Sequence, residues 1–167
     1  MQEELHTQGS LKSNKDMLLE YLKTQKLMSL AVYNQKLWIA TVYYYIDDDF
    51  NFYIFTSPQT KHAKLIGKSN EVVCNIYDSH QKITDNKIGV QVSGKIAQIK
   101  SIKALKYALT MWNRVNPGLE SSINYKNIVN KTISGRIYKI TPQMIQFFNE
   151  KLYPEDEFEI FHFNLVT

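Results

Sequence analysis

The chain has 167 residues, enough for one domain with its own hydrophobic core. Apolar residues make up 44% and charged residues 22% of it, which excludes an intrinsically disordered chain. The net charge of +4 comes from scattered lysines, so the composition argues against nucleic-acid binding and favours a discrete anion such as a phosphate group.

The first half of the chain predicts a helix followed by three strands. Residues 13–16 have the form of a capping box, which opens a helix within the N-terminal segment 1–26. The apolar runs LMSLAVY, LWIATVYYYI and FYIFT follow, separated by short polar turns. Residues 37–46 are apolar at both alternating sets of positions. We therefore expect both faces of that strand to be covered, one by the barrel interior and the other by a helix, a ligand or a second subunit.

The second half predicts further strands and helices in alternation. A short helix from Lys61 to about residue 68 precedes the strand EVVCNIYD, and Gly94 marks a bulge or bend in IGVQVSGKIAQI. Ser101 opens an amphipathic helix that ends at NPG, and a helical segment covers residues 120–131. The run SGRIYKITPQMIQFF reads as a strand or hairpin in which Pro142 requires an edge or a bulge.

Together these elements give six or seven strands and two or three helices, with short connections and no βαβ rhythm. This pattern predicts a single, mainly β domain over residues 1–167: an antiparallel barrel with flanking helices. The acidic and aromatic tail, residues 150–167, has no assigned state.

The stretch FYIFTSPQTKHAKLI, residues 52–66, ends a strand abruptly in hydroxyl and basic side chains. These side chains are Thr56, Ser57, Thr60, Lys61, His62 and Lys64. A helix that begins here leaves backbone N–H groups unpaired, and with the hydroxyls and cations they suit a phosphate monoester. An ordinary capped helix with a solvated basic face is the alternative that the spacing leaves open.

The same stretch, followed by NEVVCNIYD and GVQVSGKIAQI, resembles the pyridoxamine 5′-phosphate oxidase-like split-barrel family, whose members bind FMN. The similarity covers residues 27–99 and is closest to small bacterial proteins that carry T-x-H-A where the oxidases carry S-R-K-A. It implies a split antiparallel barrel, a homodimer with two sites at its interface, and FMN as the cofactor of an oxidoreductase acting on an unidentified small molecule.

The resemblance also implies roles for individual residues. Thr60, Lys61 and His62 stand where the family's phosphate-binding Ser-Arg-Lys stands, although a lysine lacks the guanidinium fork and a neutral histidine lacks charge. Ala40, Thr41 and Val42 stand where a strand passes its backbone along the flavin ring in the family. Phe55 and Thr56 occupy the strand end that lies beside the flavin. Gln91 falls on a strand whose polar side chain often reaches the flavin of the partner subunit.

One departure from the family concerns the C-terminal segment. The true oxidases end in a segment rich in Arg, Trp and His that binds the substrate, whereas this chain has no arginine after Arg136. Oxidation of pyridoxamine phosphate is therefore not expected. The alternative function is a binding module on the same barrel, for haem or another small anion, without FMN.

Other sequence features predict structure rather than chemistry. The acidic run at residues 47–49 lies where a hairpin turns and is not a metal site. The histidines His6, His62, His80 and His162 lack the spacing of zinc ligands, and no residue is assigned a catalytic role.

Two further expectations concern the cysteine and the cellular setting. The single cysteine, Cys74, occupies the apolar side of a strand and should be buried. No apolar run is long enough for a transmembrane helix, and the polar start MQEELHTQGS lacks the hydrophobic centre of a signal peptide. We therefore expect a cytoplasmic protein with no membrane partner.

Overall fold

The computed structural model describes residues 12–67 and 69–164. Within them lie four helices and seven strands. In chain order these are α1 (Asn14–Thr24), β1 (Leu27–Asn34), β2 (Lys36–Ile46), β3 (Phe52–Thr56), α2 (Lys61–Ile66), β4 (Glu71–Tyr77), β5 (Ile88–Gln98), α3 (Ile102–Val115), α4 (Tyr125–Val129), β6 (Arg136–Asn149) and β7 (Phe158–His162).

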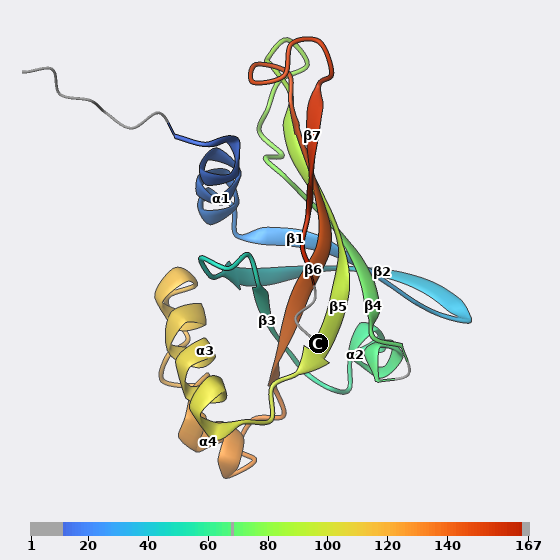
Figure 1. Ribbon diagram of the computed structural model, residues 1–167. Helices are drawn as coiled ribbons and strands as arrows, with labels where there is room; N and C mark the ends of the chain where they lie inside the picture. The colour runs from blue at the N-terminus through green and yellow to red at the C-terminus, as the bar shows by residue number, and fades with distance from the viewer. Residues whose placement is uncertain (1–11, 68, 165–167) are drawn as a thin grey trace, which may run out of the picture.

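Six of the strands close into an antiparallel barrel. They are hydrogen-bonded in the order β3-β2-β1-β4-β5-β6, and a further pairing between β3 and β6 completes the ring (Figure 1). Strand β7 pairs with β6, and together with β5 these strands extend beyond the barrel as a long arm (Figure 1). The predicted mainly β antiparallel barrel with flanking helices is confirmed.

The barrel is split between β2 and β3. The two strands pair only from Tyr44–Ile54 to Ile46–Phe52, and then they diverge. Beyond that point Val42 pairs with Met28 of β1, while Thr56 pairs with Arg136 of β6. An opening therefore lies between the first half of β2 and the end of β3.

The barrel interior is filled by the alternating apolar residues that the strand patterns predict. Its fully buried side chains include Leu30, Ile54, Ile76, Val90 and Ile140, none of which exposes any surface. Cys74 is buried among them, as expected. Such packing of inward residues against one another accounts for most of the stability of a small domain.

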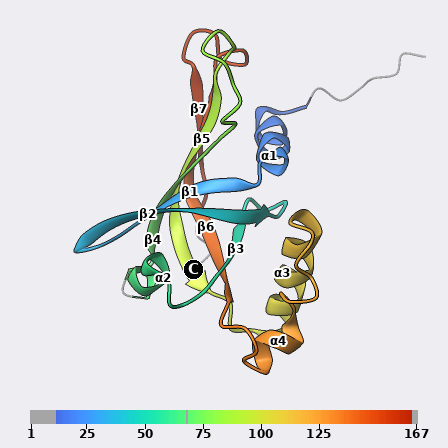
Figure 2. The same cartoon turned by 180° about the vertical axis from the view of Figure 1, so that it is seen from behind.

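The helices cover different parts of the barrel. Helices α3 and α4 lie on one outer side, and α2 lies on the opposite side (Figures 1 and 2). Helix α1 begins with the predicted capping box, in which Ser13 Oγ accepts from Asp16 N and Asp16 Oδ2 accepts from Ser13 N. In α3, Leu109 and Trp112 are buried as predicted, but Ile102, in the first turn, is 59% exposed.

The predicted bend at Gly94 is a β-bulge between β5 and β6. Ser93 pairs with Met144 and Gly94 with Pro142, so Gln143 is the extra residue on β6. A Cβ atom on Gly94 would lie 2.5 Å from the Thr141 carbonyl oxygen, so this close approach of two backbones requires glycine. Pro142 is thereby accommodated inside a barrel strand, at the one kind of interior position that tolerates it.

Three segments differ from their predicted extents. Helix α2 ends at Ile66, and Gly67 is its C-cap, whose N–H donates to the Ala63 carbonyl. The helical segment expected over residues 120–131 is shorter, since turns precede Asn124, which caps α4. The tail forms β7, which pairs with β6 from Phe158 to His162 and so belongs to the sheet.

Candidate functional site

The turn that joins β3 to α2 contains a compact polar cluster. Nε2 of His62 lies 2.8 Å from Thr56 Oγ1 and 3.1 Å from Thr60 Oγ1. The Thr60 hydroxyl also donates to the Ser57 carbonyl and accepts from the N–H of Ala63. Three of the predicted phosphate residues therefore share one internal network, which fixes the conformation of the turn.

His62 is buried in this cluster, since only 8% of its surface is exposed. Burial removes water from the charged imidazolium and so lowers the pKa of His62 below its ordinary value of 6.5. The ring is therefore neutral near pH 7 and contributes hydrogen bonds rather than charge. Its role in the turn is to hold the two threonine hydroxyls.

Lys61 and Ser57 lie at the outer side of the same turn. Lys61 Nζ sits 3.6 Å from the ring centroid of Trp38 on β2, a cation–π contact that draws the ammonium group toward the split. The Ser57 hydroxyl lies 3.1 Å from that of Ser134, in the segment that leads into β6. A charged ammonium and a pair of hydroxyls thus flank the Thr56–Thr60–His62 cluster.

The split places the β2 candidates opposite this turn. Tyr44 N donates to Lys26 O on the β1 side, so antiparallel alternation turns the backbone N–H and C=O of Thr41 and Tyr43 away from β1, into the split. Ala40 is half-buried and Val42 is buried on the same strand.

Across the split, Phe55 does not face the opening. It packs outward against Trp112 of α3, with 5.7 Å between the ring centroids. Of the ring-side candidates on β3, therefore, only Thr56 contributes a side chain next to the split.

Gln91 lies elsewhere, on the outer face of the barrel. It pairs in register with Asn75 on one side and Gln146 on the other, and Asn75 pairs in turn with Ser29. Thr41 pairs with Ser29 and completes a polar row across five strands. Gln91 is thus separated from Thr41, at the split, by the strands β1 and β4. Within a single chain it does not lie at the Thr56–Lys61 turn.

The face that carries this row is apolar and open. Leu37 is 77% exposed, Ile39 63% and Tyr43 53%, and Val73 on β4 lies beside them. Two shallow hollows, of about 330 and 270 Å³, lie on this face between β2 and β6. We call the outer surface of β1, β2 and β4 at these residues the open face.

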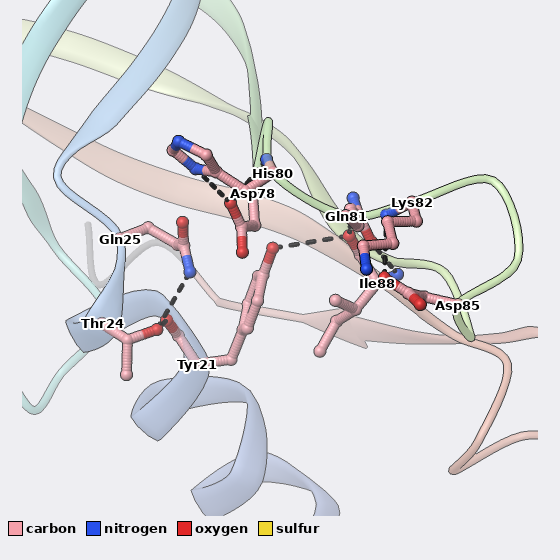
Figure 3. Close-up of polar contacts among 9 residues, drawn as sticks. All are labelled: Tyr21, Thr24, Gln25, Asp78, His80, Gln81, Lys82, Asp85 and Ile88. Atoms are coloured by element: carbon pink, nitrogen blue, oxygen red, sulfur yellow. Dashed lines mark hydrogen bonds and ion pairs between the residues drawn. The ribbon is translucent and has the colours of Figure 1, made fainter.

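The sites that the sequence analysis set aside carry structural roles. Asp47 accepts hydrogen bonds from Asp49 N, Asn51 N and the Tyr53 hydroxyl, as a turn residue does. His80 bonds Asp78 in an exposed loop, where Gln81 and Tyr21 tie the loop and α1 to Ile88 (Figure 3). His6 lies outside the described residues.

Two negative findings hold for the described part of the chain. No group of three or more histidine, cysteine or acidic side chains there is arranged to hold a metal ion. None of the helices formed by residues 12–67 and 69–164 combines the length and apolar character needed to cross a bilayer.

Two residues beside the turn were not predicted from the sequence. Ser134, just before β6, and Arg136, its first residue, lie beside the turn because Thr56 pairs with Arg136 when β3 closes the barrel. Only the register of the β3–β6 pairing brings them there, and no local sequence pattern predicts that register.

No protein-family description and no curated protein matches the sequence. Solved structures with the same fold include a haem-binding protein from Mycobacterium smegmatis, at 11% identity and a TM-score of 0.72. That match covers 91% of this chain and 59% of the other, so this chain spans less than two thirds of that protein.

Two further solved structures share the fold over most of both chains. One, from Listeria innocua, is named as a "putative pyridoxamine 5′-phosphate oxidase"; the match has 13% identity and a TM-score of 0.63, and covers 81% of this chain and 98% of the other. The other is HutZ, a haem storage protein from Vibrio cholerae, at 8% identity and a TM-score of 0.59, with 78% and 91% covered. The chain therefore has the split-barrel fold of pyridoxamine 5′-phosphate oxidase-like proteins, a fold in which both an oxidase-type and haem-binding proteins occur.

Proposed function

We propose that this protein binds FMN and acts as a flavin-dependent oxidoreductase on a small molecule. One observation carries the proposal: the split between β2 and β3 opens directly beside a turn that holds hydroxyls and a cation. A flavin mononucleotide needs both features, a slot for a planar ring and a compact site for a phosphate dianion.

The donor chemistry of the turn fits a phosphate. Lys61 supplies a full positive charge at the split, and Ser57 supplies a hydroxyl. The network of Thr56, Thr60 and His62 keeps the turn in one conformation, so little ordering entropy is lost on binding. Helix α2 has only six residues, so its dipole adds less than the side chains do.

The ring of the flavin would lie along β2 at Ala40, Thr41 and Val42. Backbone N–H and C=O groups that face the split from Thr41 and Tyr43 match the donors and acceptors on the edge of an isoalloxazine ring. Bound FMN would supply two-electron redox chemistry, and the protein would bind and orient it.

A homodimer is part of the proposal. The exposed Leu37, Ile39 and Tyr43 form an apolar surface of a kind that usually marks an interface. A partner chain on the open face would cover these side chains and bring a second Gln91 near the split, where an amide could contact the flavin.

The test is a fluorescence titration of the purified protein with FMN and with riboflavin, which lacks the phosphate. Replacing Lys61 with alanine should weaken FMN binding roughly tenfold or more and leave riboflavin binding unchanged, since one charge-assisted contact to the phosphate is lost. Lys103→Ala, on the first turn of α3, makes the same change of charge away from the turn and should bind FMN as the wild type does. No saturable binding of FMN by the wild type would contradict the proposal.

Haem is the second candidate, favoured by the two haem proteins that share the fold and by the extent of the open face. Haem binding needs an axial ligand, and the exposed histidines of the described residues, His80 and His162, lie on the loop after β4 and on β7. Titration with haemin distinguishes the candidates. A saturable Soret shift that His162→Ala or His80→Ala abolishes, without FMN binding, would make haem the ligand.

A further inference from the structure

Besides Lys61 and Lys64 of α2, a third cationic side chain, Arg136, lies beside the turn. The chain contains only two arginines, Arg114 and Arg136, among its 20 basic residues. Arg136 is the first residue of β6 and lies directly opposite Thr56 in the β3–β6 ladder. Directly opposed residues of an antiparallel pair point to the same face, with Cβ atoms about 4.5–5.5 Å apart. Arg136 and Thr56 therefore share one face at the same end of the barrel.

The contacts of Arg136 fasten it to the segment that touches the turn. Its Nη1 donates to the carbonyls of Ser134, at 3.1 Å, and Gly135, at 2.8 Å. The Ser134 hydroxyl lies 3.1 Å from that of Ser57. Within residues 12–67 and 69–164, Nη2 and Nε of Arg136 have no hydrogen-bond partner, and the side chain is only half-buried. Part of the guanidinium fork is thus available to a ligand.

The strand order puts Arg136 and Lys61 on the two sides of the turn. β3 lies between β2 and β6, Lys61 stacks on Trp38 of β2, and Arg136 belongs to β6. The end of β3 at Thr56 therefore lies between the strand that Lys61 contacts and the strand that carries Arg136, and the Ser57 hydroxyl meets Ser134 on the Arg136 side. Two cations that flank a pair of hydroxyls suit a dianion better than one cation does.

We propose that Arg136 recognises the phosphate group and gives the site its preference for a phosphorylated ligand; this rests on the proposed FMN function. A lysine acts on phosphate as a point charge, whereas a guanidinium offers two parallel N–H groups that match two phosphate oxygens. Arg136, far from Lys61 in the sequence, supplies the pair of guanidinium N–H groups that a lysine lacks.

A purely structural role for Arg136 makes a different prediction. If the side chain only ties the 134–135 segment through its carbonyl bonds, its loss would loosen the turn and weaken FMN and riboflavin alike. If it contacts the phosphate, its loss weakens FMN alone. The ratio of the two dissociation constants separates these roles, because riboflavin shares the ring but not the phosphate.

The experiment compares the wild type with Arg136→Lys, Arg136→Gln and the control Arg114→Gln, each titrated with FMN and riboflavin. Arg136→Lys keeps the positive charge and is the conservative variant. The thermal midpoint of each variant shows whether the substitution has impaired folding. We expect Arg136→Gln to lower the preference for FMN over riboflavin on the order of ten- to hundredfold, Arg136→Lys to lower it less, and Arg114→Gln to leave it unchanged. An unchanged preference in Arg136→Gln would overturn this inference and leave the FMN site standing. A wild type that binds neither flavin would overturn both.

Discussion

The barrel has two outer faces that look alike in sequence and differ in what covers them. On one, helix α3 packs Ala108, Leu109 and Trp112 against Tyr45, Tyr53 and Ile137 of the strands, and all of these are buried. On the open face, Leu37, Ile39 and Tyr43 project from β2 with more than half of their surface exposed. Figure 1 shows the asymmetry, with α3 and α4 on one side and the β1–β2 hairpin projecting away from them.

Strand β2 crosses from one face to the other and shows what the difference means. Its outward residues are apolar except for Thr41, yet Tyr45 is 8% exposed and Leu37 is 77% exposed. A single chain leaves the first half of the strand uncovered, although its composition matches the covered half. The second copy of the chain that we propose on the open face would account for this composition, since interfaces combine an apolar centre with polar groups such as the row from Thr41 to Gln146.

The two tryptophans give the sharpest contrast between the covered and exposed parts. Trp112 is 5% exposed on the side of α3 that packs against the strands, and Trp38 is 40% exposed near the tip of the β1–β2 hairpin. Trp112→Ala should lower the free energy of unfolding by about 3–5 kcal/mol, because it leaves a cavity against Phe55. Trp38→Ala should lower it by about 1 kcal/mol or less. Chemical denaturation measures both, and equal losses would contradict the contrast.

A second steric test probes the covered face. Gly135 is buried, and a Cβ atom there would lie 1.8 Å from Cζ of Phe55, which is itself held by Trp112. Gly135→Ala should therefore cost about 1–3 kcal/mol of stability. The matched control is Gly67→Ala, where the nearest atom is 3.7 Å away and φ is ordinary for a helix end, so its thermal midpoint should stay close to that of the wild type.

On the open face the expected effect is on association rather than on folding. Ile39→Lys places a charge at the centre of the apolar surface, so it should dissociate the proposed dimer while changing the unfolding free energy of the single chain by about 0.5 kcal/mol or less. Ile83→Lys, at a residue 89% exposed in the loop before β5, is the control and should associate normally. Sedimentation velocity measures the oligomeric state of each variant. An Ile39 variant that sediments like the wild type would argue against the open face as the interface.

The smallest effect concerns pH and the cluster at the turn. Because burial lowers the pKa of His62, the folded chain binds fewer protons there than the unfolded chain. The stability it contributes is complete above the unfolded pKa of 6.5 and is lost as the pH falls from that value toward the lowered folded pKa. His62→Gln should flatten the dependence of the urea midpoint on pH in this range, and parallel curves for the two proteins would contradict the assignment.

Local patterns in the sequence predicted most of the elements. The capping box at Ser13, the bend at Gly94 and the alternation of apolar residues all depend on neighbours along the chain, and the structure has each of them. The tail failed to yield a prediction because β7 is a strand only through its pairing with β6. An edge strand whose residues are mostly exposed or half-buried has little pattern of its own.

The candidate site divides in the same way. The turn from Thr56 to His62 was predicted because its residues are consecutive, but the inward orientation of His62 was not, since it depends on how α2 closes the barrel end. Ser134 and Arg136 could not have been predicted at all. Their proximity to Thr56 follows from the closure of the barrel between β3 and β6, which is a property of the complete sheet.

Sedimentation of the protein with FMN, followed at the absorbance of the flavin, tests directly whether FMN binds at the split. We expect flavin to co-sediment with a species of twice the 19.5 kDa chain mass, at one flavin per chain, and riboflavin to do so far less. Flavin that stays behind while the protein sediments would contradict the site at the split.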